Sequence, residues 1–105
     1  MHLTVLAVPG CLNAPVLEDR LAAILDGLAG VSVSHQEISD EGEAARYGMH
    51  GSPTLLIDGV DAFAEPGQLP SMACRLYRDG DGNAAGSPPA TQLRQVIEQA
   101  LARDS

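Results

Sequence analysis

Long apolar runs are missing from this sequence, in which the longest uninterrupted stretches are shorter than ten residues. A helix that crosses a bilayer needs about 20 predominantly apolar residues, so we exclude a membrane-spanning protein. Residues 1–2 lead straight into the first strand pattern and leave no room for a signal peptide. We therefore expect a cytoplasmic protein.

Positive charge is also scarce, because 6 Lys and Arg residues face 14 Asp and Glu residues. The formal net charge is −8 at pH 7. Nucleic acids and anionic membranes repel such a surface. We therefore expect no nucleic-acid partner and no membrane partner.

Cysteine is sparse, with Cys11 and Cys74 as the two thiols of the chain. In a reducing compartment such a pair does not predict a structural disulfide, so reactivity or plain burial is expected instead. The 105 residues are 45% hydrophobic. This length and composition predict one globular domain over residues 1–105 with one modest core.

The hydrophobic pattern alternates between strand and helix periods. Residues 3–8 are apolar apart from Thr4, as in a central strand buried on both faces. The other predicted elements are a helix from about 14 to 27, a strand near 31–37, a short helix ending near 47, strands at 54–57, 60–64 and 74–78, and a last helix from about 91 to 103.

Capping residues mark where the predicted helices begin. Asn13 or Ala14 is expected to cap the first helix. Asp40 with Glu43 resembles a capping box for the second helix, and Thr91 is expected to cap the last.

Three segments rich in turn residues are predicted to be loops, at 49–53, 65–73 and 79–89. Asp58-Gly59 is a strong hairpin signal between two of the strands. The run at 79–83 is similar to the start of a calcium loop, but it lacks the apolar position and the bidentate Glu. We therefore interpret it as a turn.

Cys11 follows a strand and the Pro9-Gly10 pair and comes just before a helix. The first-turn N–H groups and the helix dipole can stabilise a thiolate at such a place. The alternative is a small buried hydrophobe, as free cysteines commonly are. Thiol–disulfide chemistry usually uses C-x-x-C, but the position three after Cys11 is Ala14.

Cys74 closes the loop at 65–73, and two placements are open for it. If 54–57 and 60–64 form a hairpin, the chain returns to the sheet end where Cys11 and Pro53 lie. Cys74 would then approach Cys11 and replace the thiol that Ala14 lacks. Otherwise Cys74 begins a strand and points into the core.

The order β-α-β-α-β-β-α, with a loop proline before the third strand, resembles the thioredoxin superfamily. The most specific stretch is ARYGMHGSPTLLI at 45–57. The resemblance implies a thioredoxin-like three-layer α/β sandwich, with a mixed sheet and helices on both faces. It also implies that Pro53 is the cis-proline and Cys11 the attacking cysteine. The chain departs from the superfamily pattern in two places: Ala14 replaces the second cysteine, and a segment is inserted at about 65–74.

A narrower resemblance is carried by PGCLNAP, GSPTLLIDGVDAFAEPG and ACRLYRDGDG. These stretches are similar to small bacterial thioredoxin-like proteins labelled alkylmercury lyase. The resemblance implies binding of a soft metal or an organomercurial by thiols. In organomercurial lyases an Asp follows the cysteine by three positions, where this chain has Ala14.

Pro53 and His50 belong to the same predicted loop. A cis-proline beside a thiol turns the backbone of the preceding residue toward a substrate chain and leaves the site free of side-chain bulk. His50 can serve there as a proton donor or a metal ligand. We favour a solvated loop histidine instead.

The function we favour is thiol–disulfide oxidoreductase chemistry at Cys11 without a C-x-x-C resolving cysteine. No cofactor is expected, and the partners are a thiol or disulfide substrate or a protein. A mixed disulfide must be resolved by a second thiol, from glutathione, another protein or Cys74. The alternatives are soft-metal or organomercurial binding and a non-catalytic module that holds a peptide beside Pro53.

Overall fold

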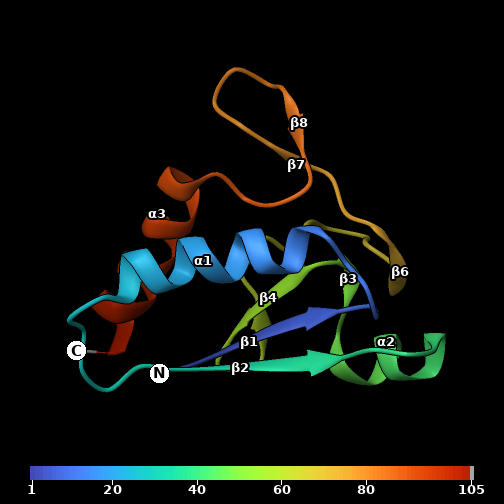
Figure 1. Cartoon of the computed structure of the whole chain (residues 1–105), viewed down its shortest axis with the longest axis horizontal. Helices are drawn as coiled ribbons and strands as arrows, with labels where there is room; N and C mark the ends of the chain where they lie inside the picture. Colours follow the sequence, from blue (N-terminus) through green and yellow to red (C-terminus); the bar gives the residue numbers. More distant parts are fainter. Residues whose placement is uncertain (105) are drawn as a thin grey trace.

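Strand β1 (His2–Ala7) lies inside a mixed sheet, in a computed structural model that describes residues 1–104. Within that range the sheet has four strands in the order β2-β1-β4-β5. The other strands are β2 (Ser32–Glu37), β4 (Thr54–Ile57) and β5 (Val60–Asp61). β1 pairs parallel with β2 and antiparallel with β4 (Figure 1). The predictions of strands at 3–8, 31–37 and 54–57 are confirmed.

Three helices cover the sheet within residues 1–104, namely α1 (Asn13–Leu25), α2 (Glu41–Tyr47) and α3 (Ala90–Asp104). Alternate residues of β1 point to opposite faces of the sheet. Leu3 and Val5 therefore pack with α1 and α3, whereas Leu6 packs with α2. Figure 1 shows α1 and α2 on opposite sides of β1. The predicted α/β class with a mixed sheet is confirmed.

The core explains why these segments become helices. Leu17 and Leu21 of α1 are four residues apart, so they lie on one helix face, as do Leu93 and Ile97 of α3. All four side chains are at most 1% exposed. Full burial of such a side chain contributes about 1.5–3 kcal/mol to folding.

Helix α2 is fixed at its N-terminal end by the predicted capping residues and at its C-terminal end by Gly48. Asp40 Oδ1 accepts a hydrogen bond from the Glu43 N–H at 2.8 Å, and Glu43 Oε1 accepts one from the Ser39 N–H at 2.9 Å. Gly48 ends the helix at φ +79° and donates its N–H to Ala44 O. The capping box is confirmed, although Glu43 binds the residue before Asp40.

The other two helices begin one or two residues away from the predicted caps. Helix α1 includes Asn13 and Ala14, and Leu12 occupies the capping position. Helix α3 begins at Ala90, which puts Thr91 inside its first turn. The predicted caps Asn13, Ala14 and Thr91 are therefore wrong as caps, although both helices exist.

All three predicted loops contain short strands, and β8 (Ala84–Ala85) lies within the expected loop at 79–89. β3 (His50–Ser52) lies within the expected loop at 49–53, and β6 (Ser71–Cys74) begins within the expected loop at 65–73. β3 and β6 pair in parallel, with Ser52 opposite Cys74. Strands of three or four residues carry too little periodicity to be seen in the sequence, and their partners are about twenty residues apart.

Two further strand predictions need correction. The strand at 60–64 ends at Asp61, because Asp61 Oδ1 accepts the Phe63 N–H at 2.9 Å and turns the chain. The strand predicted at 74–78 is divided in two, because β6 ends at Cys74 and β7 (Tyr77–Arg78) begins only at Tyr77. Arg75 lies between the two strands, and its side chain is buried. The strand predicted near 31–37, whose alternating pattern is typical of a half-exposed strand, is almost wholly exposed as β2, because it forms the edge of the sheet.

A hairpin projects from the body of the molecule (Figure 1). β7 pairs antiparallel with β8 (Ala84–Ala85), and Asp79 Oδ1 accepts the N–H groups of Asp81 and Asn83 in the turn between them. This confirms that 79–83 is a turn. Arg20 of α1 holds the end of the hairpin by donating to Ser87 Oγ and Pro88 O, both at 2.8 Å.

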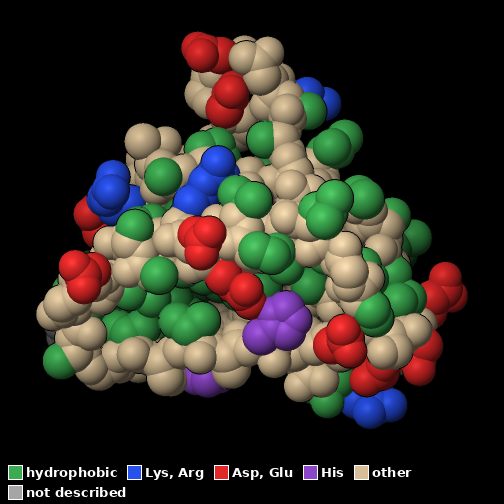
Figure 2. All heavy atoms as spheres, viewed as in Figure 1, with side chains coloured by type: hydrophobic (Ala, Val, Ile, Leu, Met, Phe, Trp, Pro, Cys, Tyr) green, Lys and Arg blue, Asp and Glu red, His purple; other side chains and the backbone are tan. Residues whose placement is uncertain are grey.

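The surface is predominantly acidic, in keeping with the net charge of −8. Figure 2 shows acidic side chains over the hairpin, along α1 and around α2. Each helix within residues 1–104 is too short or too polar to cross a membrane.

Candidate functional site: a cavity between two cysteines

Cys11 lies in the tight connection between β1 and α1. The turn at Pro9-Gly10 has Gly10 at φ +74°, a conformation that glycine adopts without a Cβ penalty. The Cys11 N–H donates to Val8 O at 3.2 Å and closes this turn. The Cys11 side chain is partly buried against the core on the α1 and α3 face of the sheet.

Helix α1 begins directly after Cys11 and Leu12. No side chain within residues 1–104 caps this helix end by a hydrogen bond, and its first turn contains no acidic residue. The acidic residues of this helix, Glu18 and Asp19, begin only at the sixth helical position, which is outside the first turn. The positive end of the helix therefore faces the neighbourhood of Cys11 without a carboxylate beside it.

Pro53 joins β3 to β4, and the Ser52–Pro53 peptide bond is cis, as predicted. Ser52 ties this junction to the Cys11 connection, since its Oγ accepts the Val8 N–H at 3.0 Å. The Ser52 carbonyl accepts the Arg75 N–H at 3.1 Å. The edge beside Pro53, expected to face a substrate chain, is thus occupied by the chain's own residues 71–75.

Cys74 lies on β6 directly opposite Ser52 and is exposed. Cys74 and Cys11 line one cavity of about 310 Å³. The rest of its lining consists of Val8, Pro9, Gly10, Leu12, Asn13, Ser52 and Met72. The core-facing placement considered for Cys74 is therefore wrong, and the cavity brings together two thiols that are 63 positions apart in the sequence.

A buried ionic network lies next to this junction, and its residues were not among those predicted from the sequence. Arg75 Nη1 donates to Asp61 Oδ2 at 2.9 Å and to Thr54 Oγ1 at 3.2 Å, while its Nη2 donates to Phe63 O at 2.7 Å. The side chains of Arg75 and Asp61 are 6% and 4% exposed. Arg75 therefore ties the segment after β6 to both β4 and β5.

His50 joins the same network, because its Nδ1 lies 2.7 Å from Asp61 Oδ2. Its side chain is 21% exposed. The interpretation of His50 as a solvated loop residue is therefore wrong. Asp61 holds the ring in place, as a carboxylate commonly orients a histidine.

Tyr77 packs over Arg75 and Phe63. The Arg75 guanidinium carbon lies 4.9 Å from the centre of the Tyr77 ring, and Phe63 meets that ring edge-on at 5.5 Å between centroids. The Tyr77 hydroxyl donates to Pro53 O. Burial raises the pKa of Tyr77 well above its usual range; the nearby Arg75 opposes this rise, and the negative charges of Asp61 and of Cys11 when ionised add to it. Tyr77 thus links the ionic network to Pro53 and to the Cys11 side of the site.

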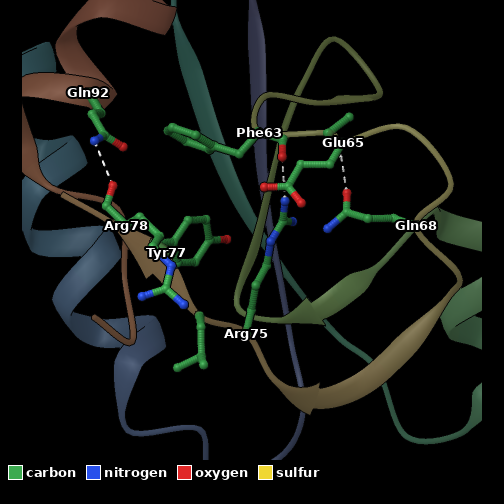
Figure 3. A pocket seen from close by; sticks show the side chains of 9 residues that line it. Phe63, Glu65, Gln68, Arg75, Tyr77, Arg78 and Gln92 are labelled. Carbon is green, nitrogen blue, oxygen red and sulfur yellow. Dashed lines mark hydrogen bonds between the residues drawn. The ribbon is translucent and has the colours of Figure 1, made fainter. Parts of the chain in front are cut away.

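A second hollow of about 330 Å³ opens on the outer side of this network. Figure 3 shows Arg75, Tyr77 and Phe63 at its wall, with Gln68 bound to the Glu65 backbone and Gln92 bound to the Arg78 carbonyl. The polar groups of these side chains are engaged within the protein. This hollow is therefore a product of the packing around Arg75, and neither cysteine lines it.

No family model, curated protein or solved structure matches the chain. The fold and the site define an α/β protein with a mixed sheet, in which two free thiols line one cavity beside a helix N-terminus and a cis-proline.

Proposed function

We propose that this chain is a thioredoxin-like protein that carries out thiol–disulfide exchange, with Cys11 as the attacking thiol and Cys74 as the resolving thiol. The observation that carries the proposal is the lining of one cavity by both cysteines. Cys74 provides the second thiol that a C-x-x-C motif would normally contain, since Ala14 occupies the usual place of that cysteine.

The arrangement of the elements supports a thioredoxin-like three-layer sandwich. α1 and α3 pack on one face of the mixed sheet, and α2 packs on the other. Cys11 precedes α1, and Pro53 precedes β4 with a cis peptide bond. These are the positions that the resemblance assigns to the attacking cysteine and the cis-proline.

The proposed reaction balances with thiols alone. The Cys11 thiolate attacks one sulfur of a substrate disulfide, which forms a mixed disulfide and releases the other sulfur as a thiolate. The Cys74 thiolate then attacks Cys11, forms the Cys11–Cys74 disulfide and releases the second substrate thiolate. The substrate is reduced to two thiols and the protein is oxidised to a disulfide. Two molecules of a small thiol such as glutathione return the protein to its dithiol form and are themselves oxidised to a disulfide.

Two features of the site favour Cys11 as the attacking thiol. The uncapped N-terminus of α1 stabilises negative charge on a nearby sulfur. The acidic side chains of α1 begin at its sixth residue, so the first turn presents N–H groups without an opposing carboxylate. Cys74 lies on a strand and has no comparable helix end at its own position.

The test uses an aromatic disulfide, 5,5′-dithiobis(2-nitrobenzoate), at one equivalent per reduced protein. The wild-type chain should release both aromatic thiolates and leave a monomer lighter by two hydrogens. Cys74→Ser should release one thiolate and keep the other as an adduct on Cys11. Retention of an adduct by the wild type, or dimers joined through Cys11, would contradict the proposal.

A rescue variant isolates the role of Cys74. Ala14 lies in the first turn of α1, three residues after Cys11, and is 3% exposed. The double variant Ala14→Cys/Cys74→Ser moves the resolving thiol to this neighbouring position with a small change in volume. It should recover release of the second aromatic thiolate, whereas Ala14→Ser/Cys74→Ser should not. If the two double variants release the same amount of the second aromatic thiolate, a missing resolving thiol does not explain the loss of release in Cys74→Ser.

Alkylation separates this chemistry from a non-catalytic binding module. Cys74 is exposed and Cys11 is partly buried, so access alone predicts that Cys74 reacts first. Activation by the helix end predicts the opposite order. Limiting iodoacetamide near pH 7, followed by peptide mapping, should label Cys11 first. Preferential labelling of Cys74 would favour the binding module.

A further inference from the structure

A third sulfur belongs to the cavity that Cys11 and Cys74 line, namely the thioether of Met72. Met72 and Cys74 both belong to β6, and both line the cavity. Cys11 reaches the same cavity from the β1–α1 connection. Met72 is partly buried and packs against the core on the α2 side of the sheet, which anchors its backbone.

We propose that these three sulfurs form a binding site for a soft monovalent metal ion, with copper(I) as the ion that fits best. Thiolates and thioethers select copper(I) over hard cations, which prefer carboxylate and carbonyl oxygens. The cavity lining contains no His, Asp or Glu side chain. The ligand set of Cys11, Met72 and Cys74 is therefore soft throughout.

The same lining disfavours zinc. Structural zinc sites are almost always closed by four ligands drawn from Cys, His and carboxylates. No group of three or more such side chains within residues 1–104 is arranged to hold a metal. The site reaches three protein ligands by including a thioether, which is a soft donor.

The electrostatic balance suits a single positive charge. Two thiolates and one copper(I) leave one net negative charge in the cavity. This charge lies beside the N-terminus of α1, a helix of 13 residues whose first turn has no carboxylate to compete. The apolar side chains of Val8, Leu12 and Pro9 complete the wall of the cavity.

Binding needs no oxidant or reductant. Two thiol protons leave to the buffer as the copper–sulfur bonds form, and the metal stays in its +1 state. Metal binding does not require the exchange reaction to take place, but it uses the same two cysteines. A bound ion would occupy both thiolates and block exchange until a competing thiol removed it.

The test titrates the reduced full chain with copper(I), without oxygen, against the colorimetric copper(I) chelator bathocuproine disulfonate. We expect one copper(I) per chain and competition with the chelator. Met72→Leu keeps the volume of the side chain but removes the thioether. It should weaken binding by about 10-fold or more, as loss of groups around a metal commonly does.

The matched control is Met49→Leu, since Met49 lies in the same core cluster as Met72 but outside the cavity lining. Its copper(I) affinity should equal that of the wild type. Equal affinity of Met72→Leu and the wild type would overturn the three-sulfur site. Absence of copper(I) binding by the wild type would overturn the metal site altogether.

A spectroscopic readout identifies the thioether directly. The chain has three methionines, Met1, Met49 and Met72, and each gives one methyl signal when labelled with carbon-13. Addition of silver(I), a diamagnetic substitute for copper(I), should shift the Met72 signal and leave the Met49 signal in place. An unmoved Met72 signal on a silver-bound chain would overturn the assignment. If the chain binds no metal but still releases both aromatic thiolates, the metal site is wrong and the proposed exchange reaction is not affected.

Discussion

The side-chain oxygen of Ser52 accepts the backbone N–H of Val8 at 3.0 Å, and this bond joins the two connections that carry the site. Val8 in turn accepts the N–H of Cys11, and Ser52 lies opposite Cys74 in the β3–β6 pair. A short path of hydrogen bonds and strand pairing therefore leads from one cysteine to the other.

Replacement of Ser52 by alanine should loosen that path. Ser52 is 2% exposed, so Ser52→Ala leaves the partly buried Val8 N–H without its acceptor, at a cost of about 1 kcal/mol, the lower end of the range for a buried donor. Urea unfolding measures this cost. Because the Cys11 connection loses a support, release of the second aromatic thiolate should also slow. Ser71→Ala serves as the control, since Ser71 Oγ accepts the Ala73 N–H at an exposed place; comparable effects of both variants would contradict the prediction.

Neutralising Asp61 should destabilise the fold strongly. Asp61→Asn leaves the buried Arg75 guanidinium without a carboxylate and removes the partner of His50. Breaking a buried ion pair from one side costs about 3–5 kcal/mol. The exposed pair of Glu18 and His35 provides the comparison, and Glu18→Gln should cost less than about 1 kcal/mol. Similar urea midpoints for the two variants would show that the Arg75 network is not a support of the fold.

A methyl group at Gly51 should not be tolerated. Gly51 has φ +108°, and a Cβ there would lie 2.8 Å from the Cβ of Arg75 and 3.2 Å from Ala73 O. Backbone strain of about 1–2 kcal/mol and overpacking of about 1–3 kcal/mol should therefore add in Gly51→Ala. Gly67→Ala separates the two effects, because Gly67 has φ +78° but an added Cβ would meet no described atom within 4 Å. A loss of stability no larger than that of Gly67→Ala would rule out the contact with Arg75.

The raised pKa of Tyr77 predicts how stability depends on alkaline pH. An unfolded tyrosine loses its proton near pH 10, whereas the buried Tyr77 keeps it. The stability contributed by the neutral phenol is fully present below about pH 10 and is lost as the pH rises. The slope should reach about −1.4 kcal/mol per pH unit. Tyr77→Phe should remove this part of the slope, and an unchanged slope measured by urea unfolding would contradict the prediction.

The elements that the sequence predicted are those whose own residues determine them. The apolar run at 3–8, the spacing of Leu93 and Ile97, and the Asp40–Glu43 pair each act within one segment, and the corresponding strand and helices are present. The strands β3 and β6 exist because they pair with each other across some twenty residues. Such short, non-local pairings leave no periodic pattern for the sequence to display.

The residues of the candidate site form the same two groups: some could be predicted from their own segment, and others come together only in the folded chain. Cys11 and Pro53 stood out because they adjoin predicted elements, and the cis bond before Pro53 is confirmed. The chemical roles of Cys11 and Cys74 stay predictions. Arg75, Asp61 and Tyr77 were missed because charged and phenolic side chains are expected at the surface. Their burial depends on three segments that meet only in the folded chain. An arginine between two apolar or aromatic neighbours, as in Cys74-Arg75-Leu76, was the one available signal.

The pairing of β1 also has a consequence for the newly made chain. Leu3 pairs with Ile57 and Leu6 with Thr54, so one edge of this buried strand has no partner until the segment around residue 57 has been synthesised. At about 5–20 residues per second, that interval lasts several seconds. During this time an apolar strand with an open edge is available to other chains. The ribosome tunnel and chaperones would therefore matter most for the first half of this protein, before β4 closes the sheet.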